Sequence, residues 1–185
     1  MKKHRFDPNK HHRRSTRCPE YDYTSPGAYF ITICADKRQF IFGEIVDGIL
    51  YANACGQTVI EVWNRLPLYF RHISLDVFVV MPNHVHGILW INERLDSKPP
   101  PPWQENRRPN GTAPGSVSAI IQNFKSVSTR RVNRLRGTKG RIWQRNFYDR
   151  INRNQESLHS IRQYIINNPL SWEDDLENPD RVPNL

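Results

Sequence analysis

Two apolar stretches separated by a short turn constrain the fold of this chain more than any other feature. Residues 73–81 and 85–91 are rich in Val, Ile and Leu, and the turn residues Pro82 and Asn83 lie between them. High strand propensity on both sides of so short a turn predicts two antiparallel strands that are neighbours in one sheet. We therefore expect an antiparallel sheet at the centre of the fold.

The remaining segments predict further strands and three helices. Strand propensity is high in residues 29–35, in 40–51 around the turn dipeptide Asp47-Gly48, and in 141–151. Apolar residues recur at helical spacing in residues 53–66, 116–136 and 154–168. This order of elements resembles an elaborated ferredoxin-like or RRM-like sandwich, which predicts an α+β fold with an antiparallel sheet and helices on one face.

The chain has 185 residues, a length typical of one domain. Changes in composition divide it further. We expect a basic flexible arm at residues 1–21, a domain at 22–172 that contains a proline-rich loop at 94–115, and an acidic tail at 173–185.

Positive charge is in excess, because 27 Lys and Arg residues oppose 18 Asp and Glu residues and give a formal net charge of +9. Such a balance predicts a polyanionic partner. The candidates for contact with DNA phosphates are Arg130, Arg131, Arg134, Lys139, Arg141 and Arg145. A basic face in contact with solvent alone is the alternative. The aromatic residues that could stack on bases, or pack in the core instead, are Trp103, Trp143, Phe147 and Tyr148.

No stretch of the sequence stays apolar over the roughly 18 residues that a membrane span needs, and the basic N-terminal region is followed by no apolar segment. We therefore expect a cytoplasmic protein with neither a transmembrane helix nor a secretory signal. The three cysteines, Cys18, Cys34 and Cys55, form no C-x-x-C pair, so we expect reduced thiols rather than a disulfide framework or a thiolate zinc site.

Two histidines begin the second strand of the central pair, in the segment Met-Pro-Asn-His-Val-His-Gly at residues 81–87. Successive side chains of a strand alternate between its faces, so His84 and His86 should point the same way. Two imidazoles beside a turn can bind a divalent metal ion that enters from solvent. By itself the pattern is weak, since a surface or hydrogen-bonded pair of histidines has the same spacing.

A second cluster lies in the last predicted helix, in Gln-Tyr-Ile-Ile-Asn-Asn-Pro at residues 163–169. Tyr164 and Asn168 are four residues apart and should share a helix face at the edge of the apolar stripe. Pro169 disfavours α geometry in the residue before it, so we expect Asn168 at the helix end or just past it. The alternative for Tyr164 is packing at the boundary of helix and sheet, with its hydroxyl bonded to water or backbone.

These two segments occur together with Tyr-Phe-Ile-Thr at residues 29–32 and Trp-Gln-Arg-Asn-Phe-Tyr at 143–148. The combination resembles the single-tyrosine transposases of the HUH kind, where U is a hydrophobic residue. Within them it resembles the insertion-sequence 200-like group, which includes the REP-associated tyrosine transposases. The resemblance extends over residues 22–172.

The resemblance implies a ferredoxin-like fold, Tyr164 as the nucleophile, and His84, His86 and Asn168 as ligands of a divalent metal ion, Mg²⁺ or Mn²⁺. Asn168 stands where many insertion-sequence transposases have Gln. Members of the family act on single-stranded DNA beside a hairpin, such as a REP-like palindrome, and work as monomers or homodimers. Their tyrosine forms a 5′-phosphotyrosine link and leaves a free 3′-hydroxyl, and rejoining reverses the step.

Two other functions stay open. A non-catalytic RRM-like protein that binds nucleic acid would explain the basic surface and the aromatic residues, but not the joint occurrence of His84, His86, Tyr164 and Asn168. An HUH nickase of replication or conjugation fits less well, because the chain is short and has one tyrosine in the helical motif. A zinc deaminase is excluded, because the H-x-E and P-C-x-x-C elements are absent.

Overall fold

The computed structural model describes residues 21–95, 112–152 and 154–181. In these segments four strands form an antiparallel sheet in the order β4, β5, β1, β6. The strands are β1 (Gly27–Cys34), β4 (Ile73–Val80), β5 (His84–Ile91) and β6 (Tyr148–Asn152). β4 and β5 pair directly across the turn at 81–83. The predicted central sheet and the α+β class are therefore confirmed.

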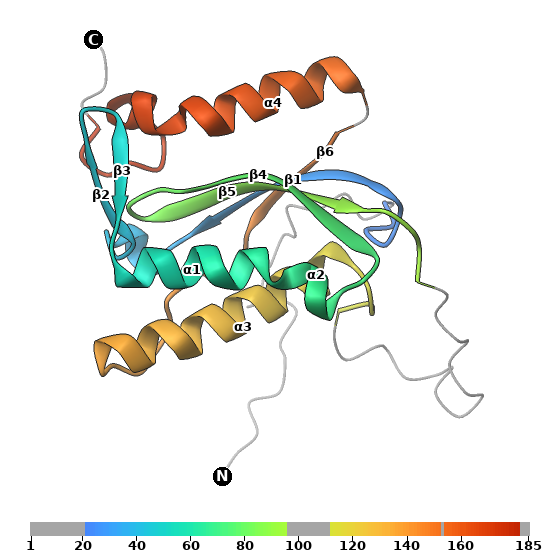
Figure 1. Ribbon diagram of the computed structural model, residues 1–185, viewed down its shortest axis with the longest axis horizontal. Coiled ribbons are helices and arrows are strands. Elements are labelled where there is room, and N and C mark those ends of the chain that lie inside the picture. Colours follow the sequence, from blue (N-terminus) through green and yellow to red (C-terminus); the bar gives the residue numbers. More distant parts are fainter. Residues whose placement is uncertain (1–20, 96–111, 153, 182–185) are drawn as a thin grey trace, which may run out of the picture.

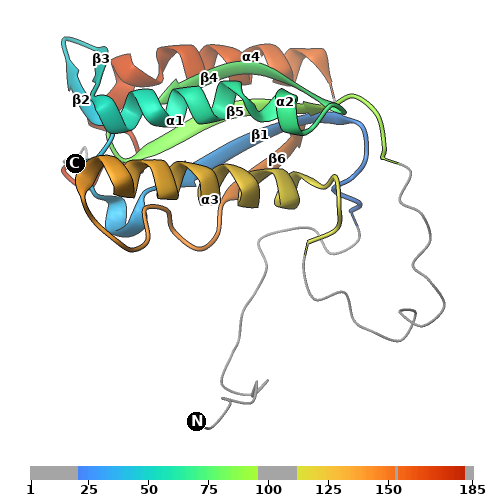
Figure 2. The same ribbon diagram turned by 60° about the horizontal axis from the view of Figure 1, so that its bottom comes forward.

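Helices cover both faces of this sheet (Figure 1). On one face lie α1 (Ala54–Asn64), α2 (Leu66–Tyr69) and α3 (Val117–Arg136), with α1 and α3 side by side (Figure 2). On the other face lies α4 (Gln155–Asn167). The expectation that all helices cover one face was wrong. The central strands carry apolar side chains on both faces, and each face needs its own cover to exclude water.

Capping residues set the ends of the helices. The side chain of Asn53 accepts hydrogen bonds from the backbone N–H groups of Cys55 and Gly56 at the start of α1. Ser116 caps α3 in the same way, and Gly137 ends that helix in the left-handed conformation. Asn154 caps α4 by accepting from the Ser157 N–H.

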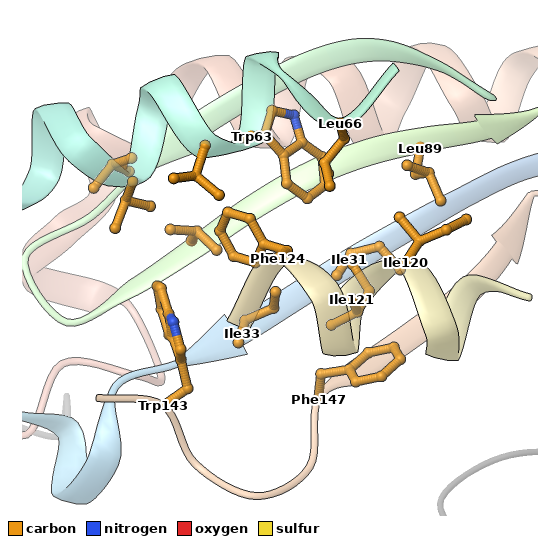
Figure 3. Packing of buried hydrophobic residues seen from close by; sticks show 14 of the residues in the cluster. Ile31, Ile33, Trp63, Leu66, Leu89, Ile120, Ile121, Phe124, Trp143 and Phe147 are labelled. Atoms are coloured by element: carbon orange, nitrogen blue, oxygen red, sulfur yellow. The ribbon is translucent and has the colours of Figure 1, made fainter. Parts of the chain in front are cut away.

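The larger core lies between the sheet and the pair α1 and α3 (Figure 3). Trp63 of α1 stacks on Phe78 of β4, with ring centroids 4.6 Å apart. Both rings lie over Gly87 of β5, where an added Cβ would stand 2.7 Å from Trp63 and 2.8 Å from Phe78. The glycine of the His-Val-His-Gly segment is therefore required by packing.

Two expected strands have a different extent. The hairpin β2 (Gly43–Val46) and β3 (Ile49–Ala52) forms a separate two-stranded sheet. Of the segment 141–151, only its end pairs as β6, while Trp143 makes a single bridge to Ala35. Two 3-10 helices, η1 (Asp36–Arg38) and η3 (Asn168–Asp174), complete the described elements.

Some expectations concern residues outside the described segments: the basic arm apart from its last residue, most of the proline-rich loop, Trp103 and Cys18. Cys34 and Cys55 are free thiols, as expected. None of the helices in the described part of the chain is long and apolar enough to cross a membrane.

Candidate active site

His84 and His86 lie at the start of β5 on the sheet face that α4 covers. Pairing with β1 sets Cys34 opposite His84 and Thr32 opposite His86. The two imidazoles converge, with 3.0 Å between their Nε2 atoms. The shared orientation follows from strand alternation, but the expected access to solvent is not found, because the two histidines are only 0% and 3% exposed.

Hydrogen bonds to the Nδ1 atoms orient both rings. The Asn83 amide donates through Nδ2 to the carbonyl oxygens of Arg38 and Glu177, so its Oδ1 is the atom that accepts from His84 Nδ1, at 2.8 Å. The lone pair of neutral His84 therefore lies on Nε2. Thr32 Oγ1 lies 2.8 Å from His86 Nδ1 and can either donate or accept. It therefore suits a proton on either nitrogen of His86.

Tyr164 and Asn168 reach the histidine pair from the end of α4. Tyr164 is 48% exposed, and its hydroxyl lies 3.4 Å from His86 Nε2. Asn168 is the C-cap residue of α4, at the predicted position, yet its backbone keeps α geometry because η3 continues the chain through Pro169. Its side chain is buried, and its Oδ1 has no hydrogen-bond partner. The two residues share one helix face, as their spacing predicted, and the fold brings Tyr164 on that face to His86.

Asp175 is the member of the cluster that sequence reasoning missed. η3 turns the chain back over β5, so that the Asp175 carboxylate lies 3.9 Å from His84 Nε2 and accepts a hydrogen bond of 2.9 Å from Asn168 Nδ2. Ligand atoms of His84, His86 and Asp175 lie within 4.8 Å of one another, and all three residues are buried. The acidic composition of residues 173–185 predicts a tail and hides this packing, whereas the aromatic Trp172 is a sequence signal for it, since its ring lies 6.1 Å from that of His84.

The segment that carries Asp175 is fixed at several points. Glu177 forms an ion pair of 3.0 Å with Arg38, and its backbone carbonyl accepts from Asn83 Nδ2 at 2.7 Å. Glu177 also accepts a hydrogen bond from the Cys34 thiol at 3.3 Å. Burial, followed by the charge of Glu177, raises the pKa of that thiol to about 12, so Cys34 stays protonated.

Burial favours the neutral form of His84, His86 and Tyr164. It lowers the pKa of His84, an effect that the Asp175 carboxylate partly offsets. Burial and the neighbouring His84 hold the pKa of His86 well below its usual value. Burial and then the Asp175 charge raise the pKa of the Tyr164 phenol. Near neutral pH the site therefore presents two neutral imidazoles, which are the form that binds metal ions, and a protonated phenol.

The donor set fits a divalent cation. Two imidazole nitrogens, one carboxylate oxygen and the unpartnered Asn168 Oδ1 converge in a buried place, where an unsatisfied amide oxygen is costly. The Nδ1 contacts of both histidines are those that orient metal-binding imidazoles in proteins. Mixed nitrogen and oxygen ligands of this kind suit several divalent ions.

An ion pair ties the α4 helix to the edge strand β4, on which it packs. Arg162, two residues before Tyr164, donates from Nε to both carboxylate oxygens of Asp76, at 3.0 and 3.1 Å. Asp76 lies at a bulge in β4 and also accepts from Trp90 Nε1. Arg162 lowers the pKa of Asp76, which keeps this carboxylate charged.

The basic residues predicted to contact DNA lie in two places. One group lies on α3, on the sheet face opposite Tyr164 (Figure 1), and consists of Arg130, Arg131 and Arg134. The other three are exposed in the segment between α3 and β6, and they are Lys139, Arg141 and Arg145. Ion pairs with Glu61 and Asp36 involve Arg131 and Arg141, at 3.6 and 3.7 Å.

The candidate base-stacking aromatic residues separate clearly by burial. Trp143 and Phe147 are 2% and 8% exposed and belong to the core. Tyr148 is 58% exposed and lies on the same sheet face as Tyr164. Of the described candidates, only Tyr148 is available to a ligand.

Comparisons with known proteins give one relative in sequence and a likeness in fold. No protein-family model matches the chain. An uncharacterized protein of Haemophilus influenzae Rd is 36% identical over 173 residues, which make up 92% of this chain and 96% of that protein.

Among solved structures, a REP-associated tyrosine transposase bound to a REP hairpin superposes with a TM-score of 0.57 at 17% identity, over 88% of this chain and 81% of that one. A Deinococcus radiodurans protein, provisionally assigned as a transposase, gives a TM-score of 0.45 at 14% identity over 83% and 97% of the two chains. At the identity and coverage of the first comparison, the chain belongs to the same family as the Haemophilus influenzae protein, and it has the fold of the REP-associated tyrosine transposase.

Proposed function

We propose that this protein is a metal-dependent tyrosine transposase of the HUH kind, which nicks and rejoins single-stranded DNA next to hairpins. The observation that carries the proposal is the phenol of Tyr164, half exposed and 3.4 Å from His86 Nε2, beside a buried cluster of metal-binding groups. A nucleophile at the open edge of a metal site is the arrangement that phosphoryl transfer to a tyrosine needs.

The residues that would hold the metal are His84, His86 and Asp175, with Asn168 Oδ1 as a fourth donor. A bound Mg²⁺ or Mn²⁺ would polarise the scissile phosphate and neutralise the charge that develops on it. Asn83 and Thr32 keep the two imidazoles aimed at this position through their Nδ1 atoms.

In the reaction that we propose, Tyr164 Oη attacks the phosphorus atom and the bond from phosphorus to the 3′ oxygen breaks. The products are a 5′-phosphotyrosine and a free 3′-hydroxyl. The phenol gives up one proton and the leaving oxygen takes up one, so the step is balanced and the reverse reaction rejoins the strand. Because burial raises the pKa of Tyr164, the phenol is protonated before attack and loses its proton as the new bond forms.

Hairpin DNA is the partner that we propose. The solved structure with this fold is bound to a REP hairpin. The net charge of +9 favours a polyanion. Because the α3 arginines lie on the sheet face opposite Tyr164, we propose that they contact phosphates of the hairpin stem, and that Lys139, Arg141 and Arg145 contact the strand that leads to Tyr164.

The test is the formation of a covalent adduct. Labelled hairpins with randomised single-stranded flanks are incubated with the full chain and Mg²⁺ or Mn²⁺, and adducts that survive denaturation are isolated and sequenced. We expect adducts with the wild type, none with Tyr164→Phe, and normal yield with Tyr69→Phe, an exposed tyrosine on α2. Hairpin binding by Tyr164→Phe should stay within a few-fold of wild type. Binding without any adduct would indicate the non-catalytic RRM-like alternative.

Metal dependence has its own test in the same assay. EDTA, His84→Ala and His86→Ala should each abolish the adduct, since an imidazole is a strong donor. Asn168→Ala should keep partial activity that rises with metal concentration, because water can replace an amide oxygen. Full yield in excess chelator would contradict the metal site.

A further inference from the structure

The helix α4 leaves part of its sheet face open, over β1 and β6. Its apolar side chains Leu158, Ile161 and Ile165 pack with β4 and β5 residues such as Val77 and Ile88. The neighbouring strands β1 and β6 form the floor of an open pocket of about 460 Å³, with α4 and residues 175–177 as its walls. This volume lies within the roughly 300–1,000 Å³ of ligand sites in proteins.

The pairing of β1 with β6 decides which side chains form the floor. Phe30 lies opposite Arg150, and Thr32 lies opposite Tyr148. Directly paired residues of antiparallel strands point to the same face, so these four side chains lie together. Tyr164 lines the adjacent wall, so its hydroxyl opens onto the pocket.

The pocket offers both stacking surface and positive charge. Tyr148 is 58% exposed, and among the described residues its ring stacks on no other aromatic ring. The half-buried ring of Phe30 packs between His86 and Tyr164, at 5.4 and 6.0 Å, and one side of it lines the pocket. Arg150 is exposed and has no ion-pair partner in the described part of the chain.

The acidic residues of the pocket are already engaged. Asp175 accepts from Asn168 Nδ2 and from the Glu177 N–H, and Glu177 pairs with Arg38. The groups still available to a ligand are the ring of Tyr148 and the guanidinium of Arg150. A ligand with a flat aromatic ring and a negative charge matches them.

We propose that this pocket binds the nucleotide next to the scissile phosphate, with its base stacked on Tyr148 and a phosphate at Arg150. The inference rests on the proposed function, because it assigns part of the substrate to the wall that carries Tyr164. Stacking on an aromatic ring accepts any base, so the pocket holds the strand in place and contributes little base selectivity.

The test measures binding without cleavage. Fluorescein-labelled oligo(dT) and an abasic oligonucleotide of equal length are titrated with the full chain in EDTA, and anisotropy is recorded. We expect Tyr148→Ala to weaken oligo(dT) binding by about 5- to 150-fold, the range found when a stacking ring is removed, and to leave abasic binding within about twofold. Tyr148→Phe should bind as the wild type does, since the ring remains.

Two matched variants separate stacking from charge. Tyr69→Ala removes a tyrosine of similar exposure from α2 and should change neither affinity. Arg150→Gln should weaken both probes and reduce the slope of log affinity against log salt by about 0.7. Equal loss of both probes in Tyr148→Ala, or no loss at all, would overturn the stacking role.

A second measurement distinguishes binding in the pocket from binding elsewhere on the basic surface. Oligo(dT) that contains 5-iododeoxyuridine is irradiated in the complex, and the cross-linked peptides are identified by mass spectrometry. Cross-links at Tyr148 or Phe30 are expected, and cross-links confined to other parts of the chain would exclude the pocket. Because neither measurement needs metal or cleavage, base-dependent binding without any covalent adduct would refute the nuclease and keep the pocket. Covalent adducts together with binding that does not depend on Tyr148 would keep the nuclease and refute the pocket.

Discussion

Lowering the pH should destabilise this protein through His84 and His86. Both imidazoles are buried, and burial lowers the pKa of each below its ordinary value. A histidine in the unfolded chain has a pKa of about 6.5. Below that pH the unfolded chain binds protons that the folded protein does not. The free energy of unfolding therefore has its full value above about pH 6.5 and decreases as the pH falls toward the lower pKa of the folded state.

The magnitude follows from proton linkage. At pH 5.5, an unfolded imidazole with a pKa of about 6.5 gains about 1.4 kcal/mol from protonation, so two imidazoles that stay neutral in the folded protein lower the free energy of unfolding by about 2.8 kcal/mol. If the pair shares one proton across the 3.0 Å between the Nε2 atoms, the loss is about 1.4 kcal/mol. The expected loss between pH 7.5 and 5.5 is thus about 1.4 to 2.8 kcal/mol.

The assay is urea unfolding followed by tryptophan fluorescence at pH 7.5, 6.5 and 5.5, with EDTA present. His86→Gln should remove at least half of the pH dependence. His159→Gln, on the exposed side of α4, should leave it unchanged and serves as the control. Added Mn²⁺ should stabilise the wild type at pH 7.5 and lose this effect at pH 5.5, because protons compete for the same nitrogens.

Two outcomes would refute the reasoning. An unfolding free energy that is equal at pH 7.5 and 5.5 would mean that the imidazoles take up protons as readily in the folded protein as in the unfolded chain. A pH dependence that disappears in His159→Gln but persists in His86→Gln would assign it to the surface.

Three further predictions concern packing, helix position and charge. Gly87→Ala should lower the free energy of unfolding by about 1–3 kcal/mol, because the new Cβ would stand 2.7 Å from Trp63 and 2.8 Å from Phe78; unchanged urea unfolding would contradict this packing. Asp76→Asn should lower the free energy of unfolding by at most about 1 kcal/mol. It should slow adduct formation about tenfold with hairpin affinity unchanged, because the ion pair with Arg162 ties α4 to the sheet. Equal adduct rates would refute a positioning role for Asp76. Replacing the three α3 arginines with Gln should reduce the salt slope of hairpin binding by about two to three units, and an unchanged slope would make them a solvated face.

Local patterns sufficed for the elements of the fold and for the direction of several side chains. The turn at Pro82 and Asn83 predicted the pairing of β4 with β5, and strand alternation predicted that His84 and His86 point the same way. The spacing of Tyr164 and Asn168 predicted their shared helix face. These properties depend on neighbours within a few residues, which is why the sequence is enough to derive them.

The tertiary structure decided what depends on contacts between distant segments. The sequence did not indicate that α4 packs opposite α1 and α3, because an apolar stripe says that a helix is buried but not on which face. Nor did it indicate Asp175, whose carboxylate meets His84 across 91 positions of the chain. Its acidic neighbours favour a solvated tail, whereas contacts with distant residues, among them those of Asn83 and Arg38 with Glu177, hold that segment over the histidines. Sequence thus put His84 and His86 on one face of a strand, and Tyr164 and Asn168 on one face of a helix. Packing brought these faces together and added the Asp175 carboxylate, since long-range contacts depend on how all the elements fit together.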